Sequence, residues 1–304
     1  MSPIPTRRRF LASMIATATV PYLARGAERA GFEIGLVADA QYADVEPKGT
    51  RYYRLGKPRL AAAIEHFNGR PLAFSAHLGD LIDRVWSSFD DMAAPLATSR
   101  HTMHQLLGNH DFDVPDEHKA AVFGKMGLKR RYDSFSHGGV RFVLLDTNDV
   151  STYAYTASSP ETAQAKERLD RAVAAKVPQA KPWNGALGER QLAWLDRTCA
   201  EAREKRERVI ILAHHPVYPV DQHNLWNSDE VLAVIDRHPH VVAWFNGHNH
   251  AGNYAVRNGV PYLTLRGMVE TPDTTAFATA RILADRIVLT GHGREPSREM
   301  KLRA

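Results

Sequence analysis

The chain has 304 residues, of which 44% are hydrophobic and 24% charged, an ordinary composition for a globular protein with a sizeable core. Its net charge of +5 does not indicate nucleic-acid binding, because residues 1–26 hold four arginines and no acidic residue, which leaves 5 − 4 = +1 for the rest. The single cysteine, Cys199, excludes an internal disulfide and a cysteine-based zinc site.

The first residues have the pattern of an export signal. Arginines at positions 7–9 precede an uncharged stretch over residues 11–23, and small residues follow at 24, 26 and 27. Such a basic start, short apolar stretch and small-residue exit are typical of a signal peptide, and the paired arginines resemble a twin-arginine signal. An ordinary Sec signal or a basic terminus is the alternative. We predict a twin-arginine-type signal over residues 1–27, the twin-arginine export machinery as a partner, and a periplasmic or extracellular protein that does not remain in the membrane.

Hydrophobic periodicity after residue 31 predicts strands alternating with helices. The first half holds strands at 32–38, 72–78, 102–107, 132–136 and 140–145 and helices at 58–67 and 88–98. The pattern lapses over residues 151–188, where one helix is expected at 160–175, so we interpret this stretch as an insertion or cap. Helices at 188–203 and 228–237, strands at 208–213 and 241–246, and short strands up to residue 290 follow. This order predicts one α/β domain with a mixed sheet over 31–295 and a C-terminal tail over 296–304.

Polar residues recur where the predicted strands end. Each group follows an apolar run of the chain: Asp39 and Gln41, Asp80 and Asp83, Asn109 and His110, His214 and His215, and His248 and His250. In an open α/β sheet, ligands bind beyond the carboxyl ends of the strands, so we expect these side chains to surround one crevice. Oxygen and nitrogen ligands together suit Mn²⁺, Fe, Zn²⁺ or Co²⁺.

The ordered series D-x-(H/Q), G-D-x-x-D, G-N-H-(D/E), H-x-P and G-H-x-H resembles the calcineurin-like metallophosphoesterases over nearly the whole chain after the leader. The resemblance implies a four-layer α/β/β/α sandwich with mixed sheets and an enzyme that hydrolyses phosphoric esters or diphosphates with two divalent metal ions. It implies that one ion is held by Asp39, Gln41, Asp80 and His250, and that Asp80 bridges to a second ion held by Asn109, His214 and His248. It places His110 beside the substrate phosphate as a catalytic residue oriented by Asp83.

One departure from the family pattern is informative: residue 41 is Gln, where most members have His. Gln41 within A-D-A-Q-Y-A-D, together with the later run L-R-G-M-V-E-T-P, is similar to the manganese-dependent ADP-ribose/CDP-alcohol diphosphatases. This similarity implies cleavage of nucleoside-diphosphate-linked substrates to a nucleoside monophosphate and a phosphorylated partner, and a neutral oxygen ligand favours Mn²⁺. The candidates for contacts to such a small nucleotide substrate are Arg51, Arg54, Tyr53, Trp226 and Arg266.

Three alternatives stay open at this point. The first is a broad-specificity exported phosphodiesterase or phosphomonoesterase, which the export signal favours. The second is an inactive metal-binding module, which would have lost His110, Asn109 or a bridging ligand, and none of these is lost. The third is a nuclease, which the near-neutral body of the chain disfavours.

Overall fold

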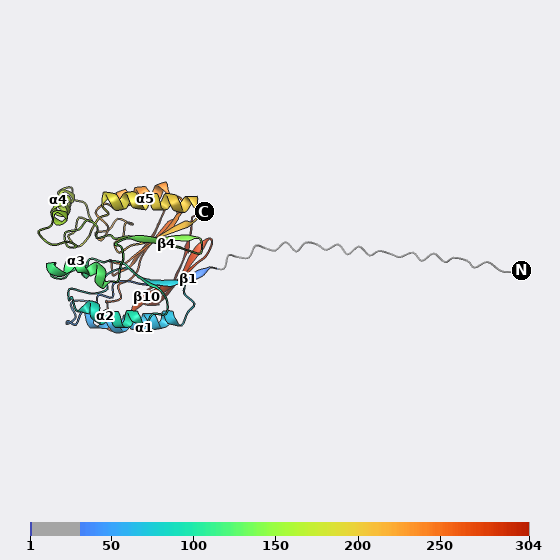
Figure 1. Ribbon diagram of the computed structural model, residues 1–304, viewed down its shortest axis with the longest axis horizontal. Helices are drawn as coiled ribbons and strands as arrows, with labels where there is room; N and C mark the ends of the chain where they lie inside the picture. The colour runs from blue at the N-terminus through green and yellow to red at the C-terminus, as the bar shows by residue number, and fades with distance from the viewer. Residues whose placement is uncertain (2–30, 304) are drawn as a thin grey trace.

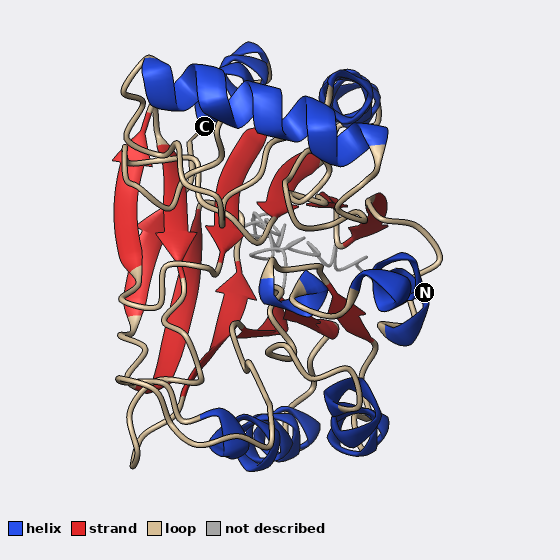
Figure 2. Cartoon of the chain, turned by 90° about the vertical axis from the view of Figure 1, so that its left-hand side faces the viewer, coloured by secondary structure: helices blue, strands red, loops and turns tan. Residues whose placement is uncertain are grey.

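The computed structural model of the protein describes Met1 and residues 31–303. Two six-stranded sheets lie face to face, and helices cover the outer face of each, as Figures 1 and 2 show. The predicted four-layer α/β/β/α sandwich with mixed sheets is therefore confirmed.

The first sheet has the strand order β12-β11-β10-β1-β2-β3. Its members are β1 (Phe32–Val37), β2 (Phe74–His77), β3 (Met103–Gln105), β10 (Ala276–Ile282), β11 (Arg286–Gly293) and β12 (Arg298–Lys301). Strands β1, β2 and β3 run parallel, whereas β10 is antiparallel to β1, with Phe32 opposite Ile282. The last four residues of β1 are fully buried, as the apolar run of the sequence predicts for a central strand.

The second sheet has the order β4-β5-β6-β7-β9-β8. Its members are β4 (Asp133–His137), β5 (Val140–Leu144), β6 (Arg208–Leu212), β7 (Val241–Asn246), β8 (Asn253–Arg257) and β9 (Val260–Thr264). The central strands β5, β6, β7 and β9 are parallel, and the hairpin partners β4 and β8 are antiparallel edges. Parallel strands in both sheets thus bring several carboxyl ends to one side of the molecule.

Three hydrophobic clusters join the layers. The largest lies between the sheets and includes Leu36, Phe142 and Phe245. The helices α1 (Gly56–Asn68) and α2 (Ser88–Ala97) pack on the first sheet, and Leu60, Ile64 and Phe67 form the buried face of α1. On the second sheet lie α5 (Glu189–Glu204) and α6 (Ser228–Arg237), whose buried residues include Cys199 and Val231. Cys199 is a small core residue, and its burial raises the pKa of the thiol to about 12.

Two further helices lie outside the four layers (Figure 1). Helix α4 (Pro160–Ala174) belongs to the insertion of residues 151–188, begins after the capping side chain of Ser159, and buries only Ala165. Helix α3 (Asp116–Lys125) was not predicted, because it has a single fully covered apolar residue, Val122, and therefore no apolar stripe in the sequence.

The predicted tail over residues 296–304 is wrong in part. Residues Arg298–Lys301 form β12, which pairs with β11, and the side chain of Met300 is fully buried in the core between the sheets. This strand is not recognisable in the sequence because only one of its four residues, Met300, faces the core. The predicted signal peptide, apart from Met1, lies outside the described residues. Within residues 31–303, no helix is long and apolar enough to cross a membrane.

Candidate metal centre and its cavity

The polar loops that follow the parallel strands converge on one crevice between the two sheets. Asp39 follows β1, Asp80 follows β2, and Asn109 lies just after β3 in the first sheet. His214 and His248 follow β6 and β7 in the second sheet. The predicted ligands therefore come from two sheets that meet at their carboxyl ends, which explains why residues more than 200 positions apart are neighbours.

One group of side chains is formed by Asp39, Asp80 and His250, whose ligand atoms all lie within 4.8 Å of one another. The His250 Nε2 atom is 3.6 Å from Asp39 Oδ1. Gln41 joins this group: its Nε2 donates to Asp80 Oδ2 at 2.9 Å and lies 3.2 Å from His250 Nε2. The Gln41 Oε1 atom is buried without a hydrogen-bond partner, so a rotation of the amide would present an unused acceptor to a cation at this place.

The second group is formed by His214, His215 and His248, whose ligand atoms all lie within 4.8 Å of one another. His214 Nε2 lies 3.4 Å from Asp80 Oδ1 and 3.1 Å from Asn109 Oδ1. The other ring nitrogen of His214 contacts the carbonyl of Leu78 at 2.8 Å, an interaction that fixes the ring orientation. Asp80 thus contacts Gln41 of the first group and His214 of the second, so its carboxylate could serve a cation in either group.

Four of the predicted ligands have a backbone conformation that is costly for a residue with a side chain. Asp39, Gln41, Asp80 and His248 have φ values of 55°, 41°, 58° and 71°. A non-glycine residue with positive φ costs on the order of 1 kcal/mol or more and is concentrated at functional sites. The sequence keeps ligand side chains at these positions in spite of this cost.

The buried carboxylates of the site favour the binding of cations. Burial lowers the pKa of His250, but its interactions with Asp39 and Glu270 outweigh burial and raise the pKa to about 9. Burial likewise opposes the charged form of His214, but the charge of Asp80 outweighs it and raises that pKa to about 9. The buried carboxylates therefore attract protons onto the imidazoles beside them. Divalent cations satisfy the same demand, and the donor set of carboxylates, amides and imidazoles fits them.

The loop that carries Asp80 is held by the buried carboxylate of Asp111. Its Oδ1 accepts from the backbone N–H groups of Leu81 and Ile82 at 2.8 and 3.2 Å. Its Oδ2 accepts from Gly108 and Asp80 at 2.8 and 3.1 Å. One side chain thus fixes the loops after β2 and β3 relative to each other, which positions two ligands at once.

His110 lies beside this centre at the start of the short 3-10 helix His110–Phe112. Its Nδ1 is 3.4 Å from Asp83 Oδ1, and Asp83 also forms a two-pronged ion pair with Arg84 at 2.8 and 3.0 Å. The guanidinium of Arg51 donates to His110 Nε2 at 3.2 Å. Burial opposes the charged form of His110, but the charge of Asp80 and the interaction with Asp83 outweigh it, so the pKa of His110 is raised. Its two ring nitrogens thus face a carboxylate on one side and the cavity on the other.

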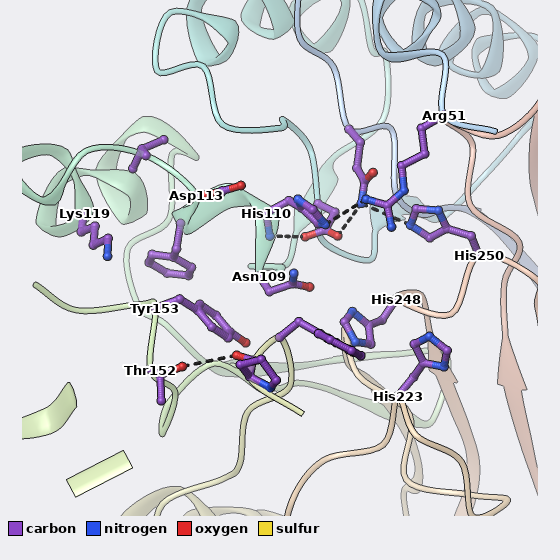
Figure 3. A pocket seen from close by; sticks show the side chains of 16 residues that line it. Arg51, Asn109, His110, Asp113, Lys119, Thr152, Tyr153, His223, His248 and His250 are labelled. Atoms are coloured by element: carbon purple, nitrogen blue, oxygen red, sulfur yellow. Dashed lines mark hydrogen bonds between the residues drawn. The ribbon is translucent and has the colours of Figure 1, made fainter. Parts of the chain in front are cut away.

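A cavity of 660 Å³ opens beside the metal-ligand groups (Figure 3). Of the five predicted substrate contacts, only Arg51 lines it. Arg54 is 49% exposed and pairs with Asp44 and Glu46 at 2.6 Å each, and Tyr53 is buried beside Arg84. The carboxylates that bind Arg54 come from its own loop, so this structure does not bring Arg54 to the cavity.

The other two predicted contacts are also engaged elsewhere. Trp226 is 7% exposed and its indole N–H donates to the carbonyl of Lys181 at 2.9 Å. Arg266 donates to the carbonyl of Arg294 at 2.7 Å. Neither side chain lines the cavity, and each forms a hydrogen bond to a backbone carbonyl elsewhere.

Instead, the insertion of residues 151–188 supplies part of the cavity wall, through Thr152, Tyr153, Pro182 and Trp183. Its Asn184 reaches the metal centre, because Asn184 Oδ1 contacts His248 Nε2 at 2.9 Å. Lys119 of α3 also lines the cavity and lies across it from His248 and His250 in Figure 3. The sequence carried no signal for these residues, since they lie in segments without strong periodicity.

The comparison with known proteins agrees with this geometry. The sequence profile described as calcineurin-like phosphoesterase matches residues 34–252. This chain belongs to the calcineurin-like phosphoesterase family. Two relatives share the name manganese-dependent ADP-ribose/CDP-alcohol diphosphatase. The Bos taurus protein is 30% identical over 326 residues, covering 90% of this chain and 94% of its own, and the Homo sapiens protein is 30% identical over 316 residues, covering 88% and 92%.

Among solved structures, a dimetal phosphatase from Danio rerio matches this calcineurin-like phosphoesterase with a TM-score of 0.79 and 28% identity, covering 89% of this chain and 98% of that one. A purple acid phosphatase from yellow lupin, at 11% identity and a TM-score of 0.55, shares the fold. The protein is therefore a metal-dependent hydrolase of phosphoric esters, as the ordered motifs predict.

Proposed function

We propose that this phosphoesterase cleaves the diphosphate of nucleoside-diphosphate-linked substrates, such as ADP-ribose or CDP-alcohols, to a nucleoside monophosphate and a phosphorylated partner. The observation that carries the proposal is the position of Gln41, which lies between Asp80 and His250 in the ligand set. The names of the relatives at 30% identity support the same substrate class. The size of the cavity, 660 Å³, is in the range of sites for ligands as large as nucleotides.

Two bound cations would supply Lewis acids for the phosphoryl oxygens and would acidify a water molecule at neutral pH. The chain itself supplies the groups around that phosphate. Arg51, which contacts His110 and pairs with Glu270 at 3.9 Å, would turn from His110 to a phosphate oxygen, because a guanidinium binds phosphate through two parallel hydrogen bonds. His110 Nε2 would then be available to carry a proton to the leaving oxygen, while Nδ1 faces Asp83.

We propose Mn²⁺ as the preferred ion, with Fe, Zn²⁺ or Co²⁺ as weaker alternatives. The neutral oxygen of Gln41 replaces an imidazole, and fewer nitrogen ligands disfavour Zn²⁺ relative to harder ions. The buried and unpartnered Gln41 Oε1 supports this view because it has no other role in the site.

The test is turnover after metal removal. The metal-free protein receives Mn²⁺, Mg²⁺ or Zn²⁺, and hydrolysis of ADP-ribose, CDP-choline and p-nitrophenyl phosphate is followed with product identification. We expect Mn²⁺-dependent release of AMP or CMP and much slower hydrolysis of the monoester. Asp80→Asn serves as the control without a bridging carboxylate and should be inactive on all three. Preference for the monoester would support the broad-specificity phosphomonoesterase instead.

We further propose that the protein is exported by the twin-arginine route, which the run of arginines at positions 7–9 and the short apolar stretch support. Cell fractionation checks this. Replacement of Arg7, Arg8 and Arg9 by lysine should retain the protein in the cytoplasm, and unchanged export would point to the Sec route.

A further inference from the structure

An exposed indole lies at the cavity. Within residues 31–303, four large apolar side chains are exposed, namely Val173, Trp183, Val220 and Val256. Trp183 is the aromatic one among them, is 41% exposed, and lines the cavity beside the metal-ligand groups. Leaving a large aromatic surface in water is unfavourable, so an indole at a cavity wall indicates a surface that a ligand covers.

The backbone of Trp183 is fixed to the loops of the metal centre. Its carbonyl contacts His215 Nε2 at 3.3 Å, and His215 Nδ1 in turn contacts Thr147 Oγ1 at 2.8 Å. The next residue, Asn184, is fully buried and contacts His248 Nε2 at 2.9 Å. The backbone that carries the indole is therefore held at a set distance from the centre, which places the side chain at the cavity wall.

The indole also has an unused polar group. No hydrogen bond from its N–H is formed within the described part of the chain, whereas the N–H of Trp226 is committed to the carbonyl of Lys181. A side chain with an open π face suits a flat heteroaromatic ring stacked on it, while its in-plane N–H stays available to another part of the ligand. Among the parts of a nucleoside-diphosphate-linked substrate, the nucleobase has this chemistry.

We propose that Trp183 is the platform on which the nucleobase of the substrate stacks, and that the insertion of residues 151–188 thereby sets the preference for nucleotides. This inference rests on the proposed function, because it assigns a place to the base while the phosphates lie at the metal centre. Stacking depends on the π face alone, so the platform accepts purines and pyrimidines alike. It explains how one site can take both adenosine and cytidine derivatives.

The test compares two ligands that differ by the base. Binding of AMP and of ribose 5-phosphate to the Mn²⁺-loaded protein is measured by calorimetry for the wild type, Trp183→Ala and Trp183→Phe. We expect Trp183→Ala to weaken AMP binding by roughly tenfold to a hundredfold, the usual effect of removing one stacking partner, and to leave ribose 5-phosphate binding unchanged. Trp183→Phe should retain most of the affinity, because it keeps an aromatic face.

Trp194 provides a matched control, since it is a partly buried tryptophan that packs on Tyr132 outside the cavity. AMP should quench tryptophan fluorescence in the wild type and in Trp194→Phe but much less in Trp183→Phe. An equal loss of AMP and ribose 5-phosphate binding in Trp183→Ala would overturn the proposal, because it would show an effect on the metal centre. Unchanged AMP binding would overturn it as well.

Hydrolysis separates this inference from the proposed function. If the wild type releases AMP from ADP-ribose, Trp183→Ala should raise KM by a similar factor and change kcat little. If the wild type does not hydrolyse ADP-ribose but its AMP affinity still depends on Trp183, the proposed reaction is wrong and the base subsite stands.

Discussion

Asn184→Ala removes the contact through which the insertion reaches the metal centre. The side-chain Nδ2 of Asn184 donates to the carbonyls of Gln179 and Gln222 at 2.9 and 2.7 Å. Because its nitrogen is committed in this way, its Oδ1 is the acceptor for His248 Nε2–H. This contact fixes the tautomer of His248 and leaves Nδ1 as the nitrogen with a free lone pair for a cation.

The size of the effect follows from these three hydrogen bonds. Asn184 is fully buried, and alanine removes all three of its hydrogen bonds. The His248 N–H and the part-buried carbonyl of Gln222 lose these partners, whereas the carbonyl of Gln179 keeps the backbone N–H of Lys181 at 2.7 Å. At about 1 kcal/mol for each net hydrogen bond, the free energy of unfolding should fall by about 3 kcal/mol. Loss of an outer hydrogen bond to a ligand histidine weakens metal affinity by about tenfold to a hundredfold, and here the loss should fall on the cation held by His214 and His248.

Two assays check this prediction. Urea unfolding of the metal-free protein gives the stability change, and calorimetric titration with Mn²⁺ gives the two affinities. Asn224→Ala is the control, because Asn224 is a buried asparagine that donates to the carbonyl of Pro219 and touches no ligand. It should cost about 1 kcal/mol and leave both affinities unchanged. Equal affinity losses for both cations in Asn184→Ala, or none, would refute the assigned role of this contact.

Three more predictions concern the same centre. Affinity for Mn²⁺ in calorimetric titrations should rise between about pH 6.5 and 9. The reason is that His214 and His250 have pKa values of about 9 without metal and must lose their protons to bind it. A pH-independent affinity would contradict the charge balance described above. Gln41→His should shift the preference from Mn²⁺ towards Zn²⁺ in competition titrations, and an unchanged ratio would deny Gln41 a ligand role. His110→Ala should lower kcat by roughly 10²–10⁴-fold on substrates with poor leaving groups and less on good ones; equal losses along a leaving-group series would exclude proton transfer by His110.

The metal centre could be predicted from the sequence because each ligand follows a short apolar run. A buried parallel strand is recognisable in the sequence as an apolar run, and the residue after it lies at the carboxyl end of the strands. Asp39 after β1 and His248 after β7 were found in this way, although they belong to different sheets. The spacing between strands did not matter, so the long insertion before His214 did not disturb the prediction.

The cavity wall could not be predicted in the same way. Trp183 and Asn184 lie in an irregular segment whose course depends on contacts with loops of the second sheet, such as the one from Asn184 to Gln222. Trp226 was the tryptophan predicted from the sequence, but its indole is buried beneath the insertion against Ala165 and Ala186. Which of two tryptophans faces a ligand is decided by tertiary packing, and local sequence does not encode it.

The position of β1 has a consequence for the order of events during synthesis. This strand is made first, yet in the finished sheet it lies between β2 and β10, and β10 is formed by Ala276–Ile282. All predicted metal ligands have been synthesised once His250 is added, but the sheet that carries Asp39 and Asp80 still lacks half of its strands. One edge of the apolar strand β1 therefore stays without its native partner β10 until translation is nearly complete. A premature stop after residue 275 would retain all of these ligands and lose the scaffold that brings them together.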